Sequence, residues 1–106
     1  MAHTVYVVEL DAAVKRSRRV QRKNPHAAKG KPAVYVGLTG QSPAQRLAAH
    51  QAGHRASRTV RKHGQRLRPD LAGSTKSSRT HDEGKKAEAR LAEQLRRQGY
   101  TVLGGT

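Results

Sequence analysis

Short apolar runs separated by long polar stretches follow one another along this chain, and the spacing within each run predicts an element of structure. Residues 4–10 and 33–38 are rich in valine and tyrosine, which favour half-buried β-strands. Two such strands most simply pair antiparallel, even when a long connection joins them. We expect Gly37 and Gly40 to mark the exit from the second strand.

A helix over residues 43–52 is predicted by the residues at its ends. Ser42 is a favourable N-cap, Pro43 suits the first helical position, and Gln45 completes a capping box. Gly53 is a natural place for the helix to end. The residues expected to form its inward face are Ala44, Leu47, Ala48 and Gln51.

A longer helix is predicted over residues 82–98 and ends at Gly99. Thr80 and Glu83 form a second capping box at its start. The apolar stripe of this helix is made of Ala87, Leu91, Ala92 and Leu95. Glu88 lies beside that stripe, so a carboxylate accompanies the face that packs on the protein.

The remaining segments give shorter patterns. Residues 57–63 predict a short helix that Gly64 ends. Residues 65–71 predict an irregular edge strand, because they contain a proline that an interior strand would not accept. Residues 73–80 read as a loop, and residues 100–103 as a terminal strand or an extended tail.

The segment 11–31 between the two strands is dense in lysine and arginine. One interpretation is a solvated, mobile loop, and the other is an arm that binds phosphates and orders on its target. We favour a loop that contacts nucleic acid. A helical turn within residues 11–22 is compatible with the sequence, which does not decide the point.

Composition narrows the class of protein. At 106 residues a single domain over residues 1–106 is expected, and with 34% hydrophobic and 3% aromatic residues its core is small. The sequence contains no cysteine, which excludes disulfides and thiolate zinc sites. No apolar run suits a membrane span or a signal peptide, so we expect a cytoplasmic protein.

Charge points to the partner. Lysine and arginine number 22 against 7 acidic residues, which gives a net charge of +15 and a pI of about 11.5. Such a domain usually binds a polyanion, and phosphate neutralisation would make the binding depend strongly on salt. An anionic membrane surface is the runner-up, but no predicted helix combines a basic face with large apolar residues. Nucleic acid, most simply DNA, is therefore the expected partner.

Five residues form a set that suits phosphodiester hydrolysis. Tyr6 and Tyr35 lie on neighbouring predicted strands, where both can face one side. Arg46 and His50 are four residues apart, which places them on one face of the following helix. A single carboxylate such as Glu88, with water and substrate phosphate, is a normal Mg²⁺ site. An arginine suits the charge of the transition state, and a tyrosine or histidine can relay the proton of the attacking water.

The order and spacing of these residues resemble the GIY-YIG nuclease superfamily. Its first motif is matched by residues 4–6 (Thr-Val-Tyr) and its second by residues 35–37 (Tyr-Val-Gly). The arginine of the family's first helix matches Arg46, and His50 follows four residues later, as in many members. The family's metal-binding glutamate matches Glu88, with Glu93 and Glu83 as competitors.

The resemblance implies both a fold and roles. The fold is α+β, a small antiparallel three-stranded sheet flanked by helices, here with a basic insertion at about residues 12–32. Glu88 would hold Mg²⁺ or Mn²⁺, Arg46 would bind the scissile phosphate, and Tyr6 would act as general base with help from Tyr35. His50 would orient water or contact phosphate. The family's third strand falls on residues 65–72, which are short and polar, with residues 100–103 as the alternative.

The resemblance therefore predicts a metal-dependent endonuclease acting on DNA. The alternatives are a non-catalytic basic domain that binds nucleic acid and keeps the fold, or a ribosome-associated protein that binds RNA. In each case the residues expected to contact nucleic acid are Lys15, Arg16, Arg18, Arg19, Arg22, Lys23, Arg55, Arg58, Arg61 and Lys62.

Overall fold

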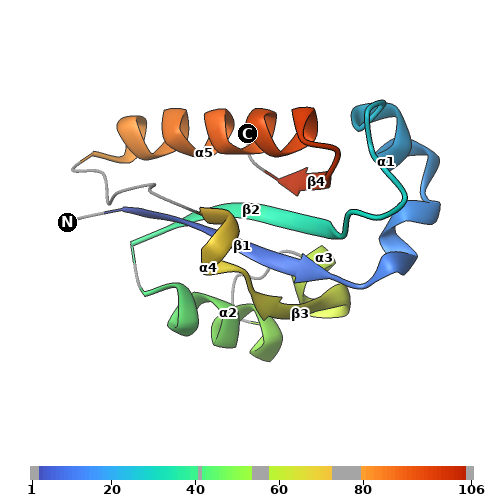
Figure 1. Cartoon of the computed structure of the whole chain (residues 1–106). Coiled ribbons are helices and arrows are strands. Elements are labelled where there is room, and N and C mark those ends of the chain that lie inside the picture. Colours follow the sequence, from blue (N-terminus) through green and yellow to red (C-terminus); the bar gives the residue numbers. More distant parts are fainter. Residues whose placement is uncertain (1–2, 41, 54–57, 73–79, 105–106) are drawn as a thin grey trace.

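A mixed sheet forms the centre of the computed structural model, which describes residues 3–40, 42–53, 58–72 and 80–104 (Figure 1). The strands of the sheet are β1 (Thr4–Leu10), β2 (Ala33–Thr39), β3 (Gly64–Leu67) and β4 (Thr101–Gly104), in the order β3-β1-β2-β4. The helices are the 3₁₀ helix η1 (Ala12–Arg16), α1 (Arg18–Lys23), α2 (Pro43–Ala52), α3 (Arg58–His63), α4 (Pro69–Ala72) and α5 (His81–Arg97).

The predicted α+β class is confirmed, and so is the antiparallel pairing of β1 with β2. β3 pairs antiparallel on the other side of β1, which completes the three antiparallel strands. β4 adds a fourth strand, parallel to β2, so both candidates for a third strand join the sheet. The predicted edge strand over 65–71 is shorter than expected. Its second half is α4, because Pro69 takes the first helical position, where its missing N–H costs nothing.

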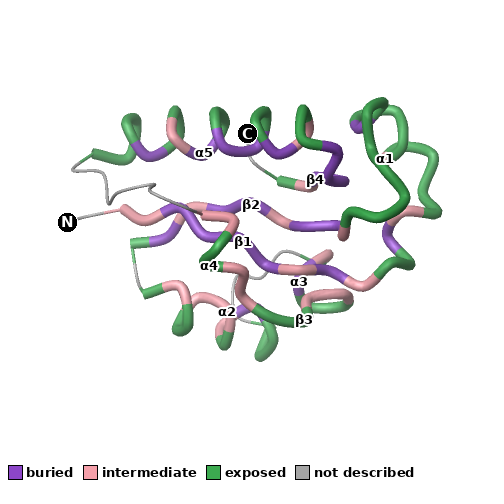
Figure 2. The backbone as a smooth tube through the Cα atoms, in the orientation of Figure 1, coloured by how far each residue is buried: buried purple, intermediate pink, exposed green. Residues whose placement is uncertain are grey.

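Each face of the sheet packs against different helices (Figure 1). On one face, valines of β1 and β2 pack against Leu91 and Leu95 of α5. On the other face, Tyr6 and Val8 pack with Val60 of α3, and Leu47 of α2 packs against the same cluster. In Figure 2, long stretches of the two central strands are buried, and so is the side of α5 that faces them. The predicted helices 43–52, 57–63 and 82–98 are therefore confirmed to within a residue or so.

The predicted inward face of α2 is wrong in most of its members. Ala44, Ala48 and Gln51 are exposed, and Leu47 is only half-buried. The residue that α2 buries most deeply is His50, which is 1% exposed. The cause is that His50 bonds to a buried tyrosine of β1, so a polar contact rather than alanine packing sets the rotation of the helix.

The basic insertion is ordered rather than a simple loop. Asp11 accepts a hydrogen bond from the Ala13 N–H at the start of η1, and Ser17 caps α1. Asn24 then bonds to β4, its side-chain carbonyl accepting from Val102 N–H at 2.8 Å and its amide donating to Val102 O at 3.1 Å. The Asn24 side chain therefore satisfies the N–H and the carbonyl of one residue on an otherwise open edge strand.

Some expectations receive no test. The predicted loop over 73–80 lies outside the described residues except for Thr80, and the single-domain organisation stays a prediction. Among the described helices, none is long and apolar enough to cross a bilayer.

Candidate active site

Tyr6 lies directly against the backbone of Gly37 on the neighbouring strand. The two residues are register partners in the β1–β2 ladder. A Cβ added at Gly37 would lie 2.5 Å from both Cζ and Oη of Tyr6, a distance that real side chains do not tolerate. The prediction that Gly37 marks the strand exit is wrong, because it sits inside β2. Its function is to leave room for the phenol ring; Gly40 does follow the strand.

His50 of α2 completes a buried cluster with the two tyrosines. Tyr6 Oη lies 2.7 Å from His50 Nε2, and the two side chains are 2% and 1% exposed. The Tyr35 ring is 6.3 Å from the Tyr6 ring and 6.0 Å from the His50 ring, measured between centroids. Three residues from two strands and a helix therefore meet on one face of the sheet.

Burial determines the protonation state of the Tyr6–His50 pair. It raises the pKa of Tyr6 to about 12, and Tyr35 adds to this, while Arg46 opposes it through hydrogen bonding and charge. Burial also lowers the pKa of His50, with a further contribution from the positive charge of Arg46. At neutral pH the phenol therefore keeps its proton and the imidazole is neutral, so the phenol O–H can donate the hydrogen bond to His50 Nε2 when the ring proton is on Nδ1.

Glu88 reaches this region from α5, on the other face of the sheet. One turn earlier in the helix, Gly84 lets α5 approach β2 closely, since a Cβ there would lie 2.8 Å from Leu38. On the side of β2 away from β1, β4 ends at Gly104, which pairs with Val36. Among the described residues, no strand pairs with the remaining end of β2 on that side. The charge of Glu88 raises the pKa of Tyr6, which places the carboxylate within electrostatic range of the phenol.

The Glu88 carboxylate is buried without full compensation. The side chain is 5% exposed, and its Oε2 has no hydrogen-bond partner among the described residues. Lys85 Nζ approaches Oε2 at 3.8 Å, which is too far for a hydrogen bond. Burial raises the pKa of Glu88, and the charges of Lys85 and His81 oppose the shift. A buried carboxylate oxygen of this kind costs free energy unless a cation or a donor satisfies it.

The competing glutamates are placed differently. Glu93 is exposed and pairs with Arg97 at 3.4 Å on the outer face of α5, and Glu83 is exposed in its first turn. Glu88 is the buried glutamate of α5, and its charge raises the pKa of Tyr6. Glu88 Oε2, which accepts no hydrogen bond from a described residue, fits Mg²⁺ or Mn²⁺, because these ions accept one protein carboxylate and take their other ligands from water and phosphate. No described group of three or more histidine or acidic residues offers a fuller protein cage.

A catalytic-domain model of one family matches most of the chain. The GIY-YIG catalytic domain aligns with residues 26–101. The chain belongs to the GIY-YIG family. This family assignment implies a nuclease, with nucleic acid as the substrate class. Neither the search of curated proteins nor the search of solved structures found a match.

The GIY-YIG match includes most but not all of the candidate site. Tyr35, Arg46, His50 and Glu88 lie inside the matched range, whereas Tyr6 lies before it. The placement of Tyr6 at the site comes from the structure, through the β1–β2 register and the hydrogen bond to His50. The sequence did not lead us to predict that Gly37 makes room for the Tyr6 ring. A glycine within a valine-rich strand is nevertheless a signal of close approach.

The basic residues predicted to contact nucleic acid lie mostly on exposed helix surfaces. The exposed ones are Arg16, Arg18, Arg19, Arg22, Lys23, Arg58, Arg61 and Lys62. Lys15 is half-buried and its ammonium donates to the Lys31 carbonyl, so it closes the insertion rather than extending into solvent. Arg55 lies outside the described residues.

Proposed function

We propose that this GIY-YIG chain is a divalent-metal-dependent endonuclease that hydrolyses phosphodiester bonds in DNA. The observation that carries the proposal is the buried Tyr6–His50 pair, with Arg46 and the buried, incompletely hydrogen-bonded carboxylate of Glu88 within electrostatic range of it. A domain that only binds nucleic acid needs positive charge, but gains nothing from a buried carboxylate with an oxygen that accepts no hydrogen bond from the described residues.

Arg46 is proposed to bind the scissile phosphate. The charge of its guanidinium lowers the pKa of both Tyr6 and His50, so a phosphate bound to Arg46 would lie near this pair. A planar guanidinium bonds two phosphate oxygens at once and follows the charge that develops in the transition state. Tyr35, edge-on to His50, would limit where the phosphate can sit.

Tyr6 and His50 are proposed to remove the proton of the attacking water together. A phenol with a pKa of about 12 does not lose its proton to solvent at neutral pH, so Tyr6 alone is a poor base. If Tyr6 passes its proton to His50 Nε2 as it accepts one from water, no phenolate accumulates. The water oxygen then bonds to phosphorus, the bond to the leaving oxygen breaks, and the leaving oxygen takes a proton from solvent. His50 returns the proton that it accepted to solvent, which restores the neutral pair.

Glu88 is the proposed ligand of Mg²⁺ or Mn²⁺. When bound, such an ion neutralises charge on the phosphoryl and leaving oxygens. The role of Glu88 would be to hold that ion through the oxygen that accepts no hydrogen bond from a described residue, within electrostatic range of the phenol that handles the proton. The net charge of +15 would hold the strand near this site.

A substrate panel tests the proposal. Plasmid, single-stranded and branched DNA, with an RNA of the same sequence, are incubated with Mg²⁺, Mn²⁺ or EDTA. We expect metal-dependent cutting of at least one DNA form, lost in Arg46→Ala and kept in Arg90→Ala, which removes an exposed arginine of α5. Cutting of RNA alone would change the substrate class. Tight binding without cutting of any substrate would favour the non-catalytic alternative.

A further inference from the structure

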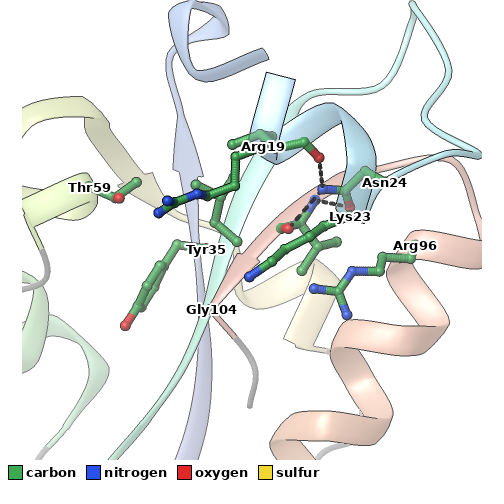
Figure 3. A pocket seen from close by; sticks show the side chains of 10 residues that line it. Arg19, Lys23, Asn24, Tyr35, Thr59, Arg96 and Gly104 are labelled. Carbon is green, nitrogen blue, oxygen red and sulfur yellow. Dashed lines mark hydrogen bonds between the residues drawn. The ribbon is translucent and has the colours of Figure 1, made fainter. Parts of the chain in front are cut away.

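A basic pocket lies beside the candidate catalytic residues, on the side of the insertion. It has a volume of about 340 Å³ and lies between α1, the end of β4 and α5. Three cationic side chains line it, Arg19 and Lys23 from α1 and Arg96 from α5. The charged ends of Lys23 and Arg96 point into the same space, while Arg19 extends toward Thr59 (Figure 3).

The positive charge of the pocket is not balanced from within. The lining residues include no aspartate or glutamate. None of Arg19, Lys23 and Arg96 makes an ion pair with a described residue. Arg97, the next residue of α5, does not line the pocket and pairs with Glu93 at 3.4 Å. The pocket therefore concentrates charge that lacks an acidic partner in the part of the chain that the structure describes.

Arg96 gives the pocket a specific vacant donor. Its Nε is buried and has no hydrogen-bond partner among the described residues. Buried donors are nearly always satisfied in folded proteins, and leaving one unpaired costs free energy. An anion in the pocket would accept from this donor, and phosphate oxygens suit the fixed donor geometry of a guanidinium.

The wall that carries Arg19 and Lys23 is held in place by Asn24. This side chain bonds to Val20 O of α1 at 2.8 Å and to both the N–H and the carbonyl of Val102 on β4. The helix is thereby fixed against the edge of the sheet. The cations of α1 therefore start from a formed position, which lowers the ordering cost of binding.

Tyr35 connects the pocket to the candidate catalytic cluster. It lines the pocket, and its ring centroid is 6.0 Å from that of His50. A volume of about 340 Å³ is at the small end of ligand pockets, which run from roughly 300 to 1,000 Å³. Val102 and Leu103 add apolar surface to the lining. The pocket therefore suits one phosphate with its sugar, next to the cluster.

We propose that this pocket is a second phosphate subsite, which holds a backbone phosphate of the nucleic-acid strand near the one that is cleaved. The inference rests on the proposed function in taking nucleic acid as the ligand. The proposal adds Arg96 to the residues expected to bind nucleic acid. It also assigns Arg19 and Lys23, which were expected to attract nucleic acid only in a general way, to one phosphate site.

Matched charge removals test the subsite. Binding of a fluorescent single-stranded DNA without terminal phosphates is measured in EDTA, so that no cleavage occurs. Arg96→Gln is paired with Arg97→Gln of the same helix, and Lys23→Gln is paired with Lys86→Gln on α5. Each control removes one exposed positive charge outside the pocket. We expect about tenfold weaker binding for each pocket variant, a salt slope reduced by roughly one, and less than about a threefold loss for the controls.

A second series identifies the phosphate. Replacing single linkages with uncharged methylphosphonates should weaken wild-type binding most at one linkage, and Arg96→Gln should lose that sensitivity. Equal losses in pocket and control variants, or equal sensitivity at every linkage, would overturn the proposal. Lys23 is exposed, so Lys23→Gln decides the matter if Arg96→Gln does not fold. Because cleavage is not measured, a protein that passes this test and never cuts DNA refutes only the nuclease proposal.

Discussion

Tyr6 Oη and His50 Nε2 lie 2.7 Å apart in the buried centre of the molecule, although 44 residues separate them in sequence. The phenol comes from a central strand and the imidazole from the first helix after the second strand. Burial moves their pKa values in opposite directions, up for Tyr6 and down for His50. At neutral pH the Tyr6 phenol is therefore protonated and the His50 imidazole beside it is neutral.

The first prediction concerns pH. Because the pKa of His50 lies below its usual value, we expect cleavage to rise with pH through that lowered pKa and to level off by neutrality. Tyr6→Phe should lower single-turnover cleavage by roughly 10²–10⁴-fold, the usual contribution of acid–base catalysis. In His50→Gln the rate should fall at neutral pH and the part of the acid limb due to His50 should disappear.

His63→Gln serves as the control for this pH dependence. His63 bonds to Asp11 at 3.0 Å, outside the cluster, so its loss should leave the profile unchanged. Glu88 also loses its charge in acid, and the limb that remains in His50→Gln belongs to it. A full acid limb and full rate in His50→Gln would contradict the role given to His50.

The second prediction concerns Gly37. Gly37→Ala would bring a methyl group to 2.5 Å from the Tyr6 ring, so the ring or the strand must move. We expect a loss of roughly 1–3 kcal/mol in the free energy of unfolding, as for other overpacked cores, and a large loss of cleavage. Denaturant unfolding and cleavage are measured together. Gly30→Ala, where nothing lies within 4 Å, should change neither, and a fully active Gly37→Ala would contradict the close approach.

The third prediction concerns stability and metal binding at Glu88. A raised carboxyl pKa means that the folded state binds a proton more tightly than the unfolded state, so ionised Glu88 costs stability above its ordinary pKa. At pH 7 without metal, Glu88→Gln should therefore melt a few degrees higher than the wild type. The difference should shrink as pH falls toward 4.

Metal provides the second half of the same experiment. Adding Mg²⁺ should raise the melting temperature of the wild type, because an ion that binds only the folded state stabilises it. The same addition should leave Glu88→Gln unchanged. A variant that melts lower than the wild type at pH 7, or that gains as much from Mg²⁺, would mean that Glu88 has a satisfied structural role.

The fourth prediction concerns Asn24. Asn24→Ala leaves the N–H and carbonyl of Val102 without their partners on the edge strand, so we expect a loss of roughly 1–3 kcal/mol in stability. Hydrogen exchange at the Val102 amide should accelerate. Gln21→Ala, which removes one exposed hydrogen bond from the same helix, is the matched control. An unchanged Val102 exchange rate would show that Asn24 does not hold the insertion to the sheet.

Local sequence signals predicted the elements well and the contacts between them less well. Ser42 forms the predicted capping box with Gln45, and Thr80 caps α5 by accepting a hydrogen bond from the Glu83 N–H, so α2 and α5 begin within a residue of the expected position. The inward face of α2 was wrong because a hydrophobic pattern weighs alanine above histidine. The partner that rotates His50 inward is Tyr6, which is distant in sequence.

The candidate site was predictable only as a set of residues. The order of the motifs identified Tyr6, Arg46 and Glu88 as candidates. Whether residues on opposite faces of the sheet act at one site depends on the tertiary structure. Nothing local in the sequence indicates that β4 ends opposite Val36, beside the end of β2, or that Gly84 lets α5 approach it. The order in the basic insertion likewise depends on Asn24 meeting a strand 78 residues away.

The most direct measurement is a comparison of DNA cleavage by the wild type, Glu88→Gln and Glu93→Gln, purified identically and supplied with Mg²⁺. Both variants remove one carboxylate from α5, one that is buried and one that is exposed and paired with Arg97. We predict that Glu88→Gln binds DNA at least as well as the wild type but does not cut it, and that Glu93→Gln cuts at the wild-type rate. Undiminished cutting by Glu88→Gln would contradict the account.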